Sequence, residues 1–287
     1  MIPAEFDYAA PTSVAEAVRL LAERPGAKLL AGGMSLIPAM KHRLAQPPLV
    51  VDVGRLAELD GVEAQRGGVR IGAGTRHAAL LAHPALAELP LVAEAAAVIG
   101  DVQVRNRGTF GGSLVHADPA GDWPAVFLAL DGEAVLVGPK GRRSVAARDF
   151  FVRMLTSAAA EDEVLTEVTL PADGKRAGTA YRKLRQPASG FAVVGVAARV
   201  ALDRKGRIEE AALGVTGVNP VPFRAASVET RLRGSAAEDA AALRAACRDV
   251  DEADPLDDIH ASAEYRRHLV GVFAARAVAA AAERAAR

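Results

Sequence analysis

Two pairs of adjacent glycines stand where the backbone could approach an anion closely. The first pair, Gly32-Gly33, lies between a short apolar segment and Ser35, which could cap a helix. Glycine reaches positive φ and has no Cβ, so its backbone can touch a ligand. Free N–H groups beside a helix N-terminus favour an anion such as a diphosphate. Taken alone, the segment is also typical of an ordinary tight turn between a strand and a helix, with Ser35 as its cap.

The second glycine segment carries more polar groups. Three glycines, two hydroxyl side chains and two arginines lie within the ten residues 105–114. Gly111-Gly112 could form a second amide cradle, and the hydroxyls of Thr109 and Ser113 could add donors. The alternative is a surface loop with solvated arginines. Two such cradles in one domain favour a dinucleotide more strongly than either segment does separately.

The stretch 116–124 offers a carboxylate directly before an expected helix. Asp122 is expected to be the N-cap of this helix. Its carboxylate could also accept hydrogen bonds from sugar or ribityl hydroxyl groups, and the two roles can coexist. His116 and Asp118 could suggest a metal, but two ligands with no third nearby do not make a zinc-type site. We therefore predict no metal site.

Familiar catalytic motifs are missing from the sequence. There is no G-x-G-x-x-G fingerprint, no G-x-x-x-x-G-K-[ST] phosphate loop and no G-x-S-x-G nucleophile elbow. Cys247 lies in an expected helix among alanines and is interpreted as a packing residue. The dispersed histidines 42, 77, 83, 260 and 268 are assigned to surface or cap positions. We therefore predict no catalytic side chain.

Composition excludes several classes of protein. The 287 residues include 35 Lys and Arg against 35 Asp and Glu, with 8 Phe, 3 Tyr and 1 Trp, so no basic excess or rich aromatic surface points to nucleic acid. No run of 18 uncharged apolar residues predicts a membrane span, and the first residues lack the pattern of a signal peptide. The single cysteine excludes an internal disulfide and a cysteine-ligated iron–sulfur cluster built by this chain alone. These features predict a cytoplasmic protein.

The elements that must position these residues follow an α/β order and then an α+β order. Ser13 and Glu16 predict a capping box at the start of a helix, Ser35 is expected to cap a helix over 36–44, and Ser235 and Glu238 predict another capping box. Strands are expected on both sides of the glycine segments. Pro171–Gly174 is the best candidate boundary, and beyond it three strands precede three helices.

Together these segments carry a resemblance. Ala31–Pro38 and Gly100–Pro119 resemble the FAD-binding medium subunit of molybdenum hydroxylases, the carbon monoxide dehydrogenase and xanthine dehydrogenase family. The likeness covers nearly the whole chain, and 163–171 and 181–183 fit the later pattern. It implies an α+β protein with an FAD-binding PCMH-type unit of two α/β subdomains over 1–174. A C-terminal α+β domain with a three-stranded antiparallel sheet would occupy 175–287.

The resemblance also implies a set of cofactor-binding residues. One group would wrap the FAD diphosphate: Leu29, Leu30, Ala31, Gly32, Gly33, Met34, Ser35 and Leu36. A second group would complete that cradle: Thr109, Gly111, Gly112 and Ser113. Ile99 would touch the cofactor, and Asp122 would bind its hydroxyls. Leu165 and Lys183 would lie near the isoalloxazine, although Lys183 also fits an exposed lysine on a strand. Met34 departs from the family pattern, which often has a polar residue there, and this removes one side-chain hydrogen bond but no backbone donor.

The implied function is electron transfer. Substrate would be hydroxylated at a molybdenum centre on a separate large subunit, and electrons would pass through iron–sulfur clusters on a small subunit to FAD on this chain and then to an external acceptor. A dimer of heterotrimers is expected. Two alternatives remain: a stand-alone FAD-dependent reductase or oxidase of the same fold, and a cofactor-free interaction subunit whose glycine segments are simple turns.

Overall fold

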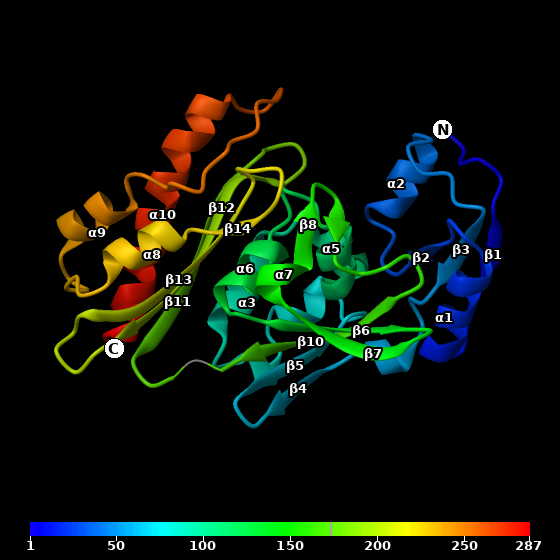
Figure 1. Ribbon diagram of the computed structural model, residues 1–287, viewed down its shortest axis with the longest axis horizontal. Coiled ribbons are helices and arrows are strands. Elements are labelled where there is room, and N and C mark those ends of the chain that lie inside the picture. The colour runs from blue at the N-terminus through cyan, green and yellow to red at the C-terminus, as the bar shows by residue number, and fades with distance from the viewer. Residues whose placement is uncertain (173) are drawn as a thin grey trace.

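The N-terminal layer is a small parallel sheet. The structure is a computed structural model that describes residues 1–172 and 174–287. Its first strands are β1 (Asp7–Ala9), β2 (Lys28–Leu30) and β3 (Leu49–Asp52), paired in the order β1-β3-β2. Helix α1 (Val14–Glu23) packs on them through an apolar face, and Figure 1 shows this layer in blue at the right of the molecule. The core of this layer is small, and Val164 of a later strand also belongs to it.

The helix starts of this layer differ from the predictions in detail. Ser13 caps α1 by accepting the N–H of Glu16 at 3.1 Å, as predicted. The Glu16 carboxylate accepts the N–H of Thr12 at 2.7 Å, where a capping box would have it accept the N–H of Ser13. Helix α2 is shorter than expected (Leu36–Lys41), and Ser35 makes no side-chain cap. Ser35 has helical backbone angles, so its side chain does not turn back onto the first amides.

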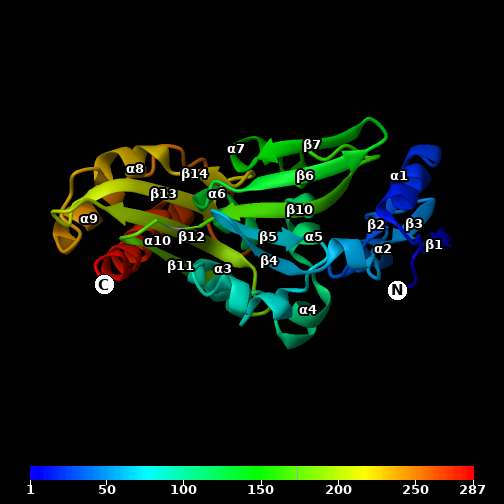
Figure 2. The same ribbon diagram turned by 90° about the horizontal axis from the view of Figure 1, so that it is seen from below.

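The central layer is an antiparallel sheet covered by helices. Its strands, in spatial order, are β4 (Val62–Gln65), β5 (Gly68–Gly72), β10 (Val164–Pro171), β6 (Glu133–Gly138) and β7 (Gly141–Ala146). The helices around it are α3 (Pro90–Val98), α4 (Val102–Arg107), α5 (Phe110–His116), α6 (Trp123–Ala129) and α7 (Ala147–Phe150). Short 3₁₀ turns lie at Ala57–Leu59, His77–Leu80 and Pro84–Leu86, and a small hairpin pairs β8 (Phe151–Arg153) with β9 (Thr156–Ser157). Figure 2 shows the strands of this sheet side by side, between the N-terminal layer and the C-terminal layer.

Aromatic side chains fill the centre of this layer. Trp123, Phe110, Phe127 and Phe150 are fully buried, and Phe110 meets Trp123 edge to face with ring centroids 4.8 Å apart. Helix α6 is buried along its whole length. Because α6 packs on the central core and also on the C-terminal sheet, it joins the two layers.

The C-terminal layer is a four-stranded antiparallel sheet, which corrects the prediction of three strands. The strands are β11 (Ala177–Arg185), β12 (Ala192–Leu202), β13 (Ile208–Thr216) and β14 (Phe223–Arg224). The helices are α8 (Ala226–Leu232), α9 (Ala240–Cys247) and α10 (Ala263–Ala285). The fourth strand has two residues, too few to show a period-2 pattern. Asp239 caps α9, so the capping box predicted at Ser235 and Glu238 does not form.

Both faces of the C-terminal sheet are covered. Ala180 and Ala198 pack toward α10, whereas Tyr181 and Ala197 join the central core. Successive residues of a strand point to opposite faces, so this alternation buries β12 on both sides. Cys247 is buried in the C-terminal core, where burial raises the pKa of its thiol to about 12, as expected of a packing residue.

Two further observations concern the predicted organisation. The boundary predicted at Pro171–Gly174 includes Asp173, which lies outside the described residues. Over the ranges that the structure describes, no helix has the length and apolar character needed to cross a membrane.

Candidate functional site

The two glycine segments lie against each other. A Cβ added to Gly32 would stand 2.2 Å from the carbonyl oxygen of Arg107 and 2.7 Å from Cα of Gly108. A Cβ added to Gly112 would lie 4.0 Å from Cβ of Ala31. Segments that are far apart in the sequence therefore meet at one place, and at Gly32 the approach is so close that glycine is required.

The first segment presents a run of free amides. In the described chain, the N–H groups of Gly32, Gly33, Met34 and Ser35 donate to no protein group. Gly33 has a φ of +75°, a left-handed conformation between residues that lead into α2. Successive N–H groups around such a residue form a concavity that binds anions. The residues of this turn therefore offer the backbone donors that an anion such as a diphosphate requires.

The second segment differs from its prediction. The N–H of Gly111 donates to the carbonyl of Ala73 at 2.8 Å, the N–H of Gly112 to Oγ1 of Thr109 at 3.2 Å, and the N–H of Ser113 to the carbonyl of Thr109 at 3.1 Å. These residues form the first turn of α5, so their amides are used within the protein and do not make a second free cradle. The Ser113 hydroxyl, half-buried, has no hydrogen-bond partner among the residues described.

Three arginines lie on, or bond to, the segment that packs against the glycine turn. Arg76 donates from its guanidinium to the carbonyl of Arg107, the carbonyl against which Gly32 packs. Arg105 donates to the carbonyl of Ile99 at 2.8 Å. Arg107 is exposed at the end of α4. The alternative of a surface loop with solvated arginines is wrong for Val102–Arg107, which form a short helix in which Arg105 bonds to the backbone.

His77 is buried against Gly108 of the second segment, which corrects its assignment to a surface or cap position. It is 4% exposed, and its Nδ1 accepts the indole N–H of Trp123 at 3.0 Å. Its backbone N–H donates to the carbonyl of Gly108 at 3.0 Å, and its ring fills the space where a Cβ on Gly108 would be. Burial has the largest effect on the imidazole, and the positive charges of Arg105 and Arg76 add to it. Together they lower its pKa from 6.5 to about 4.

This shifted pKa makes stability depend on pH. The folded-state pKa lies below the unfolded value, so between pH 6.5 and 4 the unfolded chain binds a proton that the folded chain excludes. As the pH is lowered through this window, the free energy of unfolding is therefore expected to fall by up to about 3 kcal/mol. Urea unfolding of the wild type and of His77→Gln, which keeps an acceptor for Trp123, should show a smaller decrease in the variant. Identical pH dependence in both proteins would contradict this role.

A buried ion pair joins the central and C-terminal layers. Asp122, at the start of α6, is 5% exposed, and Lys183 of β11 places its Nζ 2.8 Å from the Asp122 carboxylate with a side chain 3% exposed. The phenol of Tyr181 donates to the same carboxylate at 2.6 Å. Lys183 also donates to the carbonyl of Val98 at 3.1 Å, next to Ile99.

These contacts settle two sequence expectations. Asp122 makes no side-chain cap on α6, because its carboxylate faces Lys183 and Tyr181. Lys183 is a buried lysine, not an exposed one. Burial raises the pKa of the Asp122 carboxyl and lowers the pKa of the Lys183 ammonium, and their attraction opposes both shifts. The hydrogen bonds that each charge makes offset part of the cost of burying the pair.

The other predicted residues occupy different surroundings. Met34 is 40% exposed, whereas Leu165 is 5% exposed in the central core. Ile99 follows α3 and is half-buried beside the carbonyl that Lys183 contacts. Leu29 and Ala31 pack against the core of the N-terminal layer. The structure thus brings the two glycine segments together and brings Asp122 to Lys183, while Leu165 belongs to the hydrophobic core.

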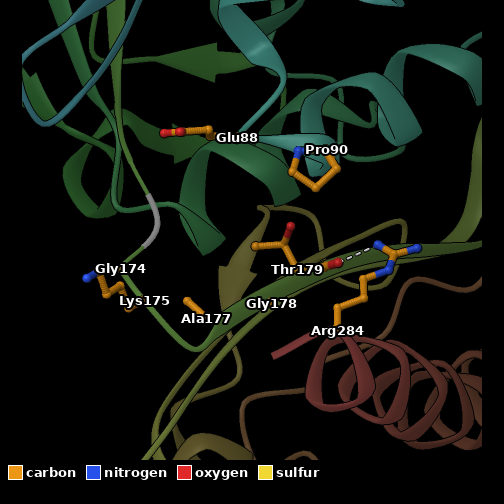
Figure 3. Close-up of a pocket in the computed structure, with 8 residues that line it drawn as sticks. All are labelled: Glu88, Pro90, Gly174, Lys175, Ala177, Gly178, Thr179 and Arg284. Carbon is orange, nitrogen blue, oxygen red and sulfur yellow. Dashed lines mark hydrogen bonds between the residues drawn. The ribbon is translucent and has the colours of Figure 1, made fainter. Parts of the chain in front are cut away.

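A separate cavity lies at the start of β11. It has a volume of about 560 Å³ and is bordered by Glu88 and Pro90 on one side and by Gly178, Thr179 and Arg284 on the other (Figure 3). Arg284 donates to the carbonyl of Thr179, shown as the dashed line. None of the residues predicted for the cofactor lines this cavity, so it is distinct from the glycine turn.

Metal ligands do not gather in the described residues. Nε2 of His116 lies 3.8 Å from Oδ2 of Asp118. Among residues 1–172 and 174–287, no group of three or more His, Cys, Asp or Glu could hold a metal ion.

Sequence reasoning missed Tyr181 and His77 as members of the site. Tyr181 stands two positions before Lys183 on a strand, so the two side chains share one face, and this spacing was the signal available. His77 follows a glycine-rich turn without any pattern that marks a buried acceptor.

Comparison with known proteins identifies the class of this fold and site as a flavoprotein subunit of an oxidoreductase. Residues 4–173 match the family described as the FAD binding domain in molybdopterin dehydrogenase, and residues 179–281 match the CO dehydrogenase flavoprotein C-terminal domain. The chain belongs to the family of FAD-binding medium subunits of molybdenum hydroxylases.

Known relatives are similar to this chain over nearly its full length. The carbon monoxide dehydrogenase medium chain of Hydrogenophaga pseudoflava is 40% identical over 98% of this chain and 98% of its own. The glyceraldehyde dehydrogenase medium chain of Sulfolobus acidocaldarius is 37% identical over 96% of this chain and 98% of its own. In the solved carbon monoxide dehydrogenase from Hydrogenophaga pseudoflava, one chain superposes with a TM-score of 0.95 at 40% identity, covering 99% of both chains. Quinoline 2-oxidoreductase from Pseudomonas putida 86 gives a TM-score of 0.93 at 28% identity, covering 100% of both chains.

Proposed function

We propose that this chain is the electron-transfer subunit of a molybdenum hydroxylase complex. In this proposal it takes electrons from iron–sulfur clusters on a small partner subunit and passes them through FAD to an external acceptor. The large partner subunit carries the molybdenum cofactor at which substrate is oxidised. The observation that carries the proposal is the run of free amides at Gly32–Ser35, held beside Arg107 and Gly108 by contacts that leave no room for a Cβ.

The residues of this chain divide the work of binding. We place the FAD diphosphate at the amides of Gly32–Ser35, flanked by Leu29–Ala31 and Leu36 and completed by Ser113 and the close packing of Thr109, Gly111 and Gly112. Ile99, Leu165 and Lys183 are placed toward the isoalloxazine. Bound FAD supplies the redox chemistry, and the protein supplies binding, orientation and charge. An ammonium at Lys183 favours negative charge on the ring by Coulomb attraction.

Partner subunits follow from the relatives, which are named as medium chains of dehydrogenases. We propose one large and one small partner, assembled as a dimer of heterotrimers in the cytoplasm. We also propose that 1–174 holds most of the cofactor contacts, while 175–287 contributes Lys183. Affinity purification from the native source, with mass spectrometry and metal analysis, should recover both partners with molybdenum and iron. Recovery of this chain without partners or metals would contradict the complex.

FAD uptake tests the cofactor assignment directly. The purified full chain, stripped of cofactor and incubated with FAD, is expected to become yellow and retain one FAD per chain after gel filtration. FMN should be retained much less, because it lacks the diphosphate that the amides contact. Equal retention of FMN and FAD would contradict the placement of the diphosphate, and no retention of either would favour the cofactor-free interaction subunit.

Turnover separates the proposal from a stand-alone reductase or oxidase. Such an enzyme needs a proton donor beside the flavin, and neither the motifs nor the buried Asp122–Lys183 pair marks one that faces an open substrate cavity. The isolated, FAD-loaded chain is therefore expected to show little turnover with hydroxylase substrates until its partners are added. Rapid substrate turnover by the chain alone would favour the stand-alone enzyme.

A further inference from the structure

The buried contacts around Asp122 include a residue to which neither the sequence nor the family likeness gave a role. The Tyr181 hydroxyl donates to Oδ1 of Asp122 at 2.6 Å, and its side chain is 5% exposed. Its backbone N–H donates to Glu94 at 2.9 Å, which fixes this part of β11 to α3. Tyr181 is thus held by both its backbone N–H and its hydroxyl.

The neighbouring strand is shaped to admit this phenol. Gly195 of β12 pairs directly with Lys183, and a Cβ at Gly195 would lie 2.4 Å from the Tyr181 hydroxyl oxygen. A larger residue at that register position would push the hydroxyl away from Asp122. The absence of a side chain at Gly195 therefore allows Tyr181, Asp122 and Lys183 to meet.

The chemistry of the three groups is connected. A carboxylate buried in the core is costly unless donors satisfy it. Asp122 has two such donors, Tyr181 and Lys183, and they come from the same strand and the same face. Loss of the phenol donor destabilises the carboxylate and moves the proton of the pair from Lys183 toward Asp122, which reduces the positive charge at Nζ.

We propose that Tyr181 is a positioning residue of the cofactor site: its hydroxyl holds the Asp122 carboxylate so that the Lys183 ammonium keeps its charge near the proposed place of the FAD ring. This inference rests on the proposed function, which places Lys183 beside FAD. Tyr181 acts through Asp122 and Lys183 and is not a catalytic residue. Its effect therefore appears in the reduction potential of bound FAD.

The test is the midpoint potential of FAD bound to the full chain. Tyr181→Phe removes one oxygen and is expected to bind one FAD per chain while its preference for the reduced cofactor falls about tenfold, a shift of about 30 mV to more negative potential for a two-electron couple. Tyr265→Phe is the matched control, because Tyr265 is 49% exposed on α10, and it should keep the wild-type potential.

A double variant separates positioning from a general structural effect. In a Lys183→Gln background, Tyr181→Phe should cause no further change in potential, because the charge through which it acts is gone. If Tyr181→Phe fails to fold, Asp122→Asn supplies the same test, since it keeps an acceptor for Tyr181 and removes the partner charge of Lys183. Its potential should also become more negative.

The outcomes distinguish this inference from the proposed function. Wild-type protein that takes up no FAD would overturn the proposed function itself. FAD uptake with a wild-type potential in Tyr181→Phe, or in Asp122→Asn where that variant is used, would overturn the positioning role alone. An equal shift from Tyr181→Phe with and without Lys183 would overturn it as well, because the effect would then not pass through the lysine.

Discussion

Gly32→Ala is expected to weaken FAD binding at least about 100-fold, a loss of about 2.8 kcal/mol. The added Cβ would stand 2.2 Å from the carbonyl oxygen of Arg107 and 2.7 Å from Cα of Gly108. Both neighbours are backbone atoms, so neither can rotate away, and the two glycine segments must separate. The free amides of the first segment would then move away from the second segment.

Fluorescence titration of the cofactor-free chain with FAD measures this effect. Gly174→Ala is the matched control, because a Cβ there meets nothing within 4 Å, and it should bind FAD as the wild type does. Circular dichroism should show that Gly32→Ala keeps its secondary structure. Wild-type affinity in a folded Gly32→Ala variant would show that the contact between the segments does not build the cofactor site.

Lys183→Met is expected to lower the free energy of unfolding by about 3 to 5 kcal/mol, because it leaves the carboxylate of Asp122 without its cation in the core. The Asp122→Asn/Lys183→Met double variant should regain much of this stability. In the double variant the neutral amide at position 122 can still accept a hydrogen bond from the Tyr181 hydroxyl, and no unpaired charge remains in the core.

Urea unfolding of the wild type, both single variants and the double variant gives the coupling energy between the two residues. A large favourable coupling is the expected result. If the two single losses simply add in the double variant, the ion pair contributes nothing to the connection between the central and C-terminal layers.

The glycine turn was predictable from the sequence because its signal is local. Gly32 and Gly33 stand between an apolar strand and a helix start, and the requirement for glycine there comes from backbone conformation and close contact. The second segment was harder, since Gly111 and Gly112 lower helix propensity and favour a loop, yet Thr109 caps a helix through them. Its amides are therefore satisfied within the helix.

The partners of Asp122 could not be predicted from local pattern. Lys183 and Tyr181 lie in another layer of the fold, and they reach Asp122 only because α6 packs on the C-terminal sheet. A residue before a helix looks like an N-cap until the tertiary contacts are known. The fourth strand of that sheet was missed for a related reason, because Phe223–Arg224 is ordered by pairing with β13 and not by its own sequence.

The central claim is that backbone amides at Gly32–Ser35 hold the diphosphate of FAD. A crystal structure of the full chain with bound FAD tests it most directly. The account predicts that diphosphate oxygens accept hydrogen bonds from these amides, with the isoalloxazine extending toward Lys183. FAD bound with its diphosphate away from this turn, and the four amides facing only solvent, would contradict it.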